Sequence, residues 1–111
     1  MDTLISNAVE RPLTVDDVEP QRSTLGCSLG NLCDAFARRV VERYLRGDLL
    51  WSDADAAMNH IFTLMTRHCG ERVPDYGWSV YLAFDAGEYQ KPGGDAVTRP
   101  LLAGLGNERS A

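Results

Sequence analysis

Residues 49–55, Leu-Leu-Trp-Ser-Asp-Ala-Asp, carry the pattern that divides the chain into helices. Ser52 is an N-cap candidate, because its hydroxyl can accept a hydrogen bond from an unpaired backbone N–H of a first helical turn. Asp55 can accept from the Ser52 amide in return, as in a capping box, although Glu or Gln is the usual residue there. Trp51 occupies the position of a hydrophobic staple onto Ala56. We therefore predict that a helix begins directly after Ser52.

Apolar residues recur at three- and four-residue steps on both sides of this stretch, as in amphipathic helices. Upstream, Gly47 is expected to end a helix as its C′ residue. Near the end of the sequence, Pro100 is tolerated in the first turn of a short last helix. The predicted helices span residues 29–46, 53–69, 74–87 and 98–105. The third of them is apolar around most of its circumference, so we expect it at the centre of the molecule.

Residues 1–27 show weaker patterns. Thr14 and Asp17 can cap a short helical turn, which Pro20 is expected to close almost at once. The fold prediction is therefore a single all-α domain, an antiparallel three- to four-helix bundle over residues 28–111. A loosely ordered N-terminal extension over residues 1–27 precedes it.

The composition of the chain is that of an ordinary globular domain, with 111 residues, 44% hydrophobic and 24% charged. No apolar run approaches the roughly 20 residues that span a bilayer. Residues 1–5 lack the basic start and the long apolar stretch of a secretory signal. We therefore expect a cytoplasmic protein that does not bind membranes.

The net charge of −5 is unevenly distributed. Residues 1–27 carry five acidic against two basic residues, residues 28–72 carry six of each, and residues 73–111 carry five acidic against three basic residues. This balance argues against direct nucleic-acid binding, which requires a basic face. It is compatible with a basic protein partner, although mild acidity is also typical of small soluble domains.

Three cysteines, an odd number, do not predict a disulfide framework in a cytoplasmic protein. The candidate metal ligands are His60, His68, Cys27, Cys33 and Cys69. His60 and His68 are eight residues apart on one helix, so their Cα atoms lie about 12 Å apart. A single zinc ion with bonds of about 2 Å does not easily take both. We expect no metal and no other cofactor.

Catalytic arrangements are also weakly indicated. Cys33 or Cys27 could form a nucleophile pair with His60, but no glycine motif typical of an oxyanion hole accompanies them. The carboxylates of Asp53 and Asp55 are explained by helix capping. A phosphate-binding glycine loop is missing from the sequence. We therefore expect no catalytic residues and a protein that is not an enzyme.

A second pair of carboxylates is harder to explain by helix formation. Acidic residues near a helix C-terminus oppose the helix dipole, which makes binding the more interesting role for them. The predicted partner-binding site consists of Asp85, Glu88, Tyr89 and Asp95. Trp78 and Tyr81 have two interpretations, as core aromatics, which is the commoner outcome at helical spacing, or as anchors of an interface.

Three short stretches follow one another in a recognisable order. They are Tyr-Leu-Arg-Gly-Asp-Leu at residues 44–49, Ile-Phe at 61–62 and Phe-Asp-Ala-Gly-Glu-Tyr at 84–89, followed by a Pro/Gly/acid loop and a short last helix. Over residues 36–105 this order resembles the colicin D-type immunity proteins of bacteria. Members of that family are small, acidic, all-helical proteins that bind a cognate tRNA-cleaving toxin and block its active site.

The resemblance implies a toxin-blocking function for this chain. A nuclease active site is basic because it holds phosphates, and an acidic helical surface can occupy it by charge mimicry. We therefore expect an immunity-type or antitoxin-like inhibitor that binds a basic, nuclease-like toxin stoichiometrically. The alternative is a homo-oligomeric structural or regulatory bundle, such as a homodimer, with no toxin target.

Overall fold

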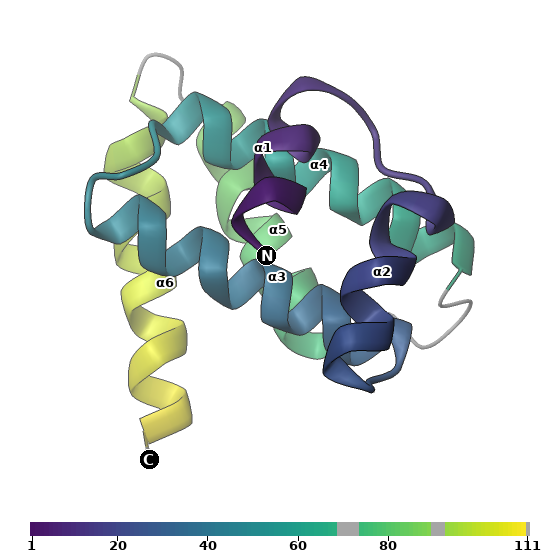
Figure 1. Cartoon of the computed structure of the whole chain (residues 1–111). Helices are drawn as coiled ribbons and strands as arrows, with labels where there is room; N and C mark the ends of the chain where they lie inside the picture. The colour runs from purple at the N-terminus through teal and green to yellow at the C-terminus, as the bar shows by residue number, and fades with distance from the viewer. Residues whose placement is uncertain (69–73, 90–92, 111) are drawn as a thin grey trace.

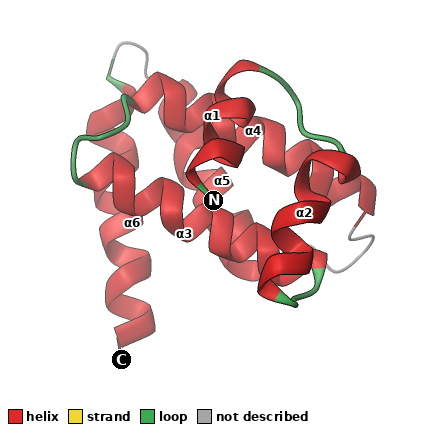
Figure 2. Ribbon diagram, in the orientation of Figure 1, coloured by secondary structure: helices red, strands yellow, loops and turns green. Residues whose placement is uncertain are grey.

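The computed structural model describes residues 1–68, 74–89 and 93–110, and this part of the chain folds into helices joined by short loops (Figure 1, Figure 2). The helices are α1 (Asp2–Glu10), α2 (Val15–Leu25), α3 (Leu29–Leu45), α4 (Trp51–His68), α5 (Asp75–Glu88) and α6 (Gly94–Ser110). The predicted all-α class is confirmed. The predicted number of three to four helices is too low, since the described residues form six.

The N-terminal segment is the main correction to the predicted fold. Residues 1–27, expected to be loosely ordered, form α1 and α2, and Ile5, Ala8 and Val18 are fully buried in the same core as the later helices. Helix α1 packs mainly against α4, while α2 contacts α3. A helix of nine residues is marginal by itself and is stabilised by tertiary packing, which a local sequence pattern does not reveal.

Helix α2 begins as predicted and ends later than predicted. The Thr14 hydroxyl accepts from the Asp17 amide at 3.3 Å, and the Asp17 carboxylate accepts from the Thr14 amide at 2.8 Å, which is a complete capping box. The helix then continues through Pro20, which costs a single backbone hydrogen bond in an exposed turn. Gly26, with a φ of 63°, ends it.

The corner between α3 and α4 confirms the predicted role of Gly47. Its φ is 86°, and its amide donates to the Tyr44 carbonyl at 3.0 Å. The next amide, that of Asp48, donates to the Arg43 carbonyl at 2.8 Å. These two bonds form a Schellman motif, which requires the left-handed backbone that glycine adopts without strain.

We expect Gly47→Val to lower the free energy of unfolding by about 1–2 kcal/mol, because a β-branched residue is strained in the left-handed region. Arg46→Val is the control, since Arg46 has an ordinary φ of −77° at the adjacent position. Urea denaturation followed by circular dichroism measures both. Equal stability of the two variants would contradict this description of the corner.

The predicted start of α4 is wrong in detail. The helix begins at Trp51, and the Ala54 amide donates to the Leu50 carbonyl at 3.0 Å, so Ser52 lies inside the first turn instead of capping it. Trp51 is itself the first residue of α4 and therefore does not occupy the position before the N-cap that a hydrophobic staple requires. The indole of Trp51 instead contacts residues of α5 and α6.

The side chain of Trp51 connects α4 with α5 and α6. Its indole N–H donates to the Thr98 hydroxyl at 2.8 Å, and the fully buried Thr98 donates to the Ala83 carbonyl at 2.9 Å. The indole ring also lies directly against Gly87 and Gly94, where an added Cβ would come within 3.0 and 2.8 Å of it. The Thr98 side chain of α6 therefore connects α4, α5 and α6 through these two hydrogen bonds.

The hydrophobic core forms one cluster, to which every described helix contributes. The predicted inner sides of α3 and α4 are confirmed at most positions, including the fully buried Phe36, Tyr44 and Ile61. His68, at the C-terminal end of α4, is exposed. Helix α5 packs against α3, α4 and α6, as expected for a helix that is apolar around most of its circumference.

Candidate functional site

The structure brings three of the four predicted site residues together at the C-terminal end of α5. Asp85 and Glu88 are separated by about one turn, and Tyr89 follows as the C-cap residue with 80% of its surface exposed. Asp95 lies in the first turn of α6. The acids of α5 and the exposed ring of Tyr89 therefore form one surface region.

Asp95 has a structural environment that the sequence did not reveal. Its carboxylate accepts from the Tyr44 hydroxyl and pairs with Arg99 at 3.1 Å, while the Arg99 guanidinium lies 4.7 Å above the Tyr44 ring. The hydrogen bond from Tyr44 and the pairing with Arg99 lower the pKa of Asp95. Burial, and then the bond to Asp95, raise the pKa of Tyr44. Asp95 therefore links α3 to α6.

Carboxylates from two helices surround the phenol of Tyr81. Its pKa is raised by burial first, and then by the negative charges of Asp85, Glu88 and Asp55. Asp55, which the sequence assigned to helix capping, is buried on α4 within electrostatic reach of this phenol. Glu88 accepts from the Asn59 side-chain amide of α4 at 2.9 Å. Negative charge is therefore concentrated where α4 meets α5.

An aromatic cluster adjoins these acids. The rings of Phe62 and Tyr81 are stacked, with centroids 3.8 Å apart and an interplanar angle of 7°. Trp78 lies 5.3 Å from Phe62 and keeps 38% of its surface exposed. Neither Trp78 nor Tyr81 belongs to the fully buried core, so the core interpretation of Trp78 is wrong and Tyr81 lies at the edge of the core.

We call this region the aromatic–acidic face, defined by Phe62, Trp78, Tyr81, Asp85, Glu88 and Tyr89. Sequence reasoning did not select Phe62 as a site residue. Its position one step outside the apolar side of α4 was the available indication, since a residue there can contact a neighbouring helix and still reach the surface.

Helix α5 also exposes apolar side chains along its length. Trp78, Leu82, Asp85 and Tyr89 follow one another at steps of four, three and four residues and therefore lie on one side of the helix, which we call the outward stripe. Leu82 is 43% exposed. Trp78, Leu82 and Tyr89 of this stripe stay exposed in the described part of the chain, and α5 carries buried residues on the opposite side.

No protein-family model, curated protein or solved structure matches this chain. The helices of the described residues include none with both the length and the apolar character of a membrane span.

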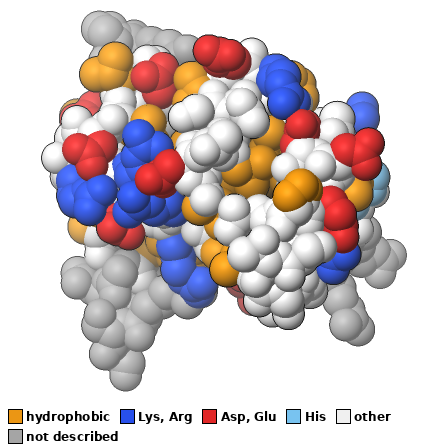
Figure 3. Space-filling model, viewed as in Figure 1, with side chains coloured by type: hydrophobic (Ala, Val, Ile, Leu, Met, Phe, Trp, Pro, Cys, Tyr) orange, Lys and Arg blue, Asp and Glu red, His pale blue; other side chains and the backbone are white. Residues whose placement is uncertain are grey.

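Arg39 of α3 and the C-cap residue Arg46 pair with neighbouring acids, while the Arg38 guanidinium lies 4.9 Å from the centre of the Tyr76 ring. Arg39 pairs with Asp2 at 2.8 Å and with Glu42 at 2.8 Å, and Arg46 pairs with Glu42 at 3.2 Å and Asp48 at 2.9 Å. Figure 3 shows basic and acidic side chains interspersed on the face that carries α1, α2 and α3. These arginines therefore do not form a continuous basic stripe of the kind that nucleic acids require.

The candidate metal ligands are dispersed. His60 donates from Nδ1 to the Ala8 carbonyl in the last turn of α1, where helix carbonyls lack intrahelical partners. Cys33 is buried in α3, Cys27 is half-buried, and Cys69 lies outside the described residues. In the described part of the chain, no group of three or more His, Cys, Asp or Glu side chains is placed to hold a metal ion.

Proposed function

We propose that this protein is a binding inhibitor of the immunity or antitoxin type, which blocks a basic, nuclease-like toxin by stoichiometric binding. The outward stripe of α5 carries the proposal, because it exposes the apolar surfaces of Trp78, Leu82 and Tyr89 next to carboxylates. Aromatic side chains are typical anchors of protein interfaces, and charges at their border steer the encounter with an oppositely charged partner.

The aromatic–acidic face also has the rigidity that an inhibitor needs. Asn59 donates to the Glu88 carboxylate, and the Phe62 ring is stacked on Tyr81 and packs at a tilt against Trp78. Side chains that are already ordered lose less conformational entropy on binding. The acids can therefore meet the phosphate-binding cations of a nuclease site without rearrangement of α4 or α5.

The resemblance to the colicin D-type immunity proteins supports the same proposal. One of its stretches, residues 84–89, combines two roles in this fold. Phe84 and Gly87 face inward and pack against the core and Trp51, while Asp85, Glu88 and Tyr89 belong to the aromatic–acidic face. A motif of this kind connects the packing of α5 with the position of its acids.

The test is a double variant, Asp85→Asn with Glu88→Gln. We expect unchanged or slightly higher stability, because both acids oppose the helix dipole and the glutamine oxygen can still accept from Asn59. A basic partner is isolated by pull-down from the native host, and its association is then measured at two salt concentrations. The association rate should fall by at least about fivefold at low salt, and its salt dependence should become weaker.

The matched control is the double variant Glu10→Gln with Asp16→Asn, which removes two exposed acids far from α5 in the sequence. It should leave the association rate at the level of the unmodified protein. If the α5 variant binds at an unchanged rate with an unchanged salt dependence, or if it unfolds, Asp85 and Glu88 are structural and the proposed site is wrong.

A further inference from the structure

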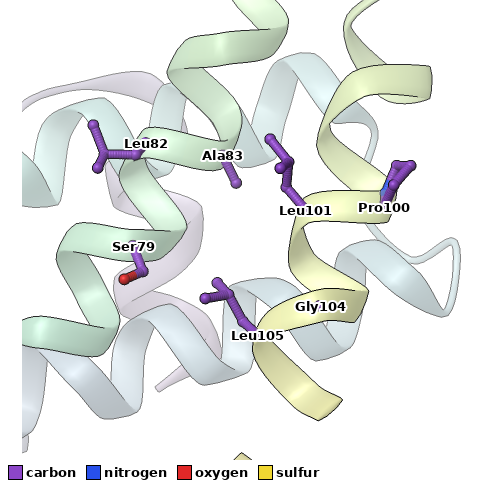
Figure 4. A pocket seen from close by; sticks show the side chains of 7 residues that line it. All are labelled: Ser79, Leu82, Ala83, Pro100, Leu101, Gly104 and Leu105. Carbon is purple, nitrogen blue, oxygen red and sulfur yellow. The ribbon is translucent and has the colours of Figure 1, made fainter. Parts of the chain in front are cut away.

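A groove of about 340 Å³ lies between α5 and α6, directly beside the outward stripe (Figure 4). Its apolar side chains are Leu82 and Ala83 from α5 and Pro100, Leu101 and Leu105 from α6. Leu101 is 47% exposed. A Cβ added at Gly104 would have no described atom of another helix within 4 Å, so the α6 wall of the groove is low at this residue.

The two walls of the groove run in opposite directions. Thr98 of α6 bonds to Ala83 of α5, whereas Leu105, further along α6, shares the groove with Ser79, further back along α5. Two antiparallel helices side by side present a groove into which the ridge of a third helix packs. A helix laid in an apolar groove is also a recurring mode of peptide recognition.

Among the described side chains of α5 next to Leu82, charge lies only on the side away from the groove. At about 100° per residue, Ser79 and Asp85 lie about 60° to either side of Leu82 on α5. The Ser79 flank is the groove, whose lining residues carry no charge. Beyond Asp85, on the side of α5 away from the groove, lie Glu88 and the phenol of Tyr81, whose pKa burial and these carboxylates raise. A segment lying on Leu82 therefore meets apolar surface on one side and negative charge on the other.

A second copy of this chain fits the groove poorly. Each copy carries a net charge of −5, and the exposed apolar segment of α6, residues 100–105, contains no basic residue that could meet the acids of α5. Arg39 of α3 and its C-cap residue Arg46 are already paired with acids of their own chain. Charge complementarity therefore favours a different protein as the occupant.

We infer that the partner presents a basic amphipathic helix, whose apolar side enters the α5–α6 groove and whose Lys or Arg residues border Asp85. This inference rests on the proposed function and specifies the part of the partner that binds. Leu82 is the shared residue, because it belongs both to the outward stripe and to the groove.

The experiment uses the full chain and three labelled peptides of about 18 residues, or five helical turns. The first is a Leu/Lys peptide with all leucines on one side of a helix. The second has the same composition in scrambled order, and the third replaces every Lys by Glu. Fluorescence anisotropy should show the first peptide binding at least about tenfold more tightly than the other two.

Variants of the chain then locate the bound peptide. Leu101→Ser and Leu82→Ser should each weaken binding of the Leu/Lys peptide by at least about fivefold, and Asp85→Asn should reduce its salt dependence. Leu25→Ser, which changes an exposed leucine of α2, is the control and should leave the affinity unchanged. Circular dichroism verifies that each variant is folded, as expected for exposed positions.

The outcomes separate this inference from the proposed function. Equal binding of the scrambled Leu/Lys peptide, with no effect of Leu101→Ser, would overturn the helix-in-groove inference and leave a preference for a basic partner intact. Equal binding of the Leu/Glu peptide would contradict the proposed basic partner itself. Sedimentation of the unliganded protein as a dimer, abolished by Leu101→Ser, would assign the groove to a second copy and overturn the inference.

Discussion

Gly87→Ala is expected to lower the free energy of unfolding by about 3 kcal/mol or more, as overpacking does where the surroundings cannot yield. The added Cβ would lie 2.6 Å from the Thr98 hydroxyl oxygen, 2.8 Å from the Gly94 carbonyl oxygen and 3.0 Å from the Trp51 ring. Two of these neighbours are fixed, because Thr98 bonds to Trp51 and to Ala83, and the Gly94 carbonyl belongs to the backbone. Urea denaturation measures the loss.

Gly104→Ala is the matched control for this prediction. It makes the same chemical change inside a helix, but no atom lies within 4 Å of the added methyl group. Alanine should therefore raise the free energy of unfolding by up to about 1 kcal/mol through its better helix propensity. Equal effects at Gly87 and Gly104 would contradict the close packing of α4, α5 and α6 around Trp51.

Ile5→Ala is expected to lower the free energy of unfolding by about 2–5 kcal/mol, the usual cost of a large cavity in a core. Ile5 is fully buried where α1 packs against α4. Ser6→Ala, at the exposed neighbouring position of the same helix, should change the stability by less than about 0.5 kcal/mol. Chemical denaturation compares the two variants. A neutral Ile5→Ala would restore the description of residues 1–27 as a loosely ordered extension.

The sequence predicts the parts of the fold whose cause is local. Helices α3, α4 and α5 are long enough for their apolar periodicity to be visible, and Gly47 ends α3 through hydrogen bonds within five residues. Helix α1 is different, because its contacts lie elsewhere in the chain, such as the bond from His60 to Ala8 across 52 positions. The start of α4 was misplaced for a similar reason, since the indole of Trp51 is held by Thr98, 47 positions away.

The candidate site divides in the same way. Asp85 and Glu88 were identified because acids near a helix C-terminus are visible in the sequence as locally unfavourable. The structural role of Asp95 is not visible in the sequence, because the hydroxyl that donates to it belongs to Tyr44, 51 positions earlier in the chain. The sequence therefore places Asp95 in the binding site. The sequence does not identify Leu82 as exposed. Whether an apolar residue of α5 is buried or exposed depends on where α6 packs, and α6 leaves Leu82 at the edge of a groove.

The attachment of α1 to α4 has a consequence for the order of folding. Its contacts close long loops, 37 residues between Asp2 and Arg39 and 52 between Ala8 and His60. Closing such loops costs entropy before any contact repays it, and distant contacts slow the folding of small domains. Helices α3, α4 and α5 are neighbours in sequence and can assemble first. The segment at the beginning of the chain is therefore expected to dock late, sealing a core that the later helices have already formed.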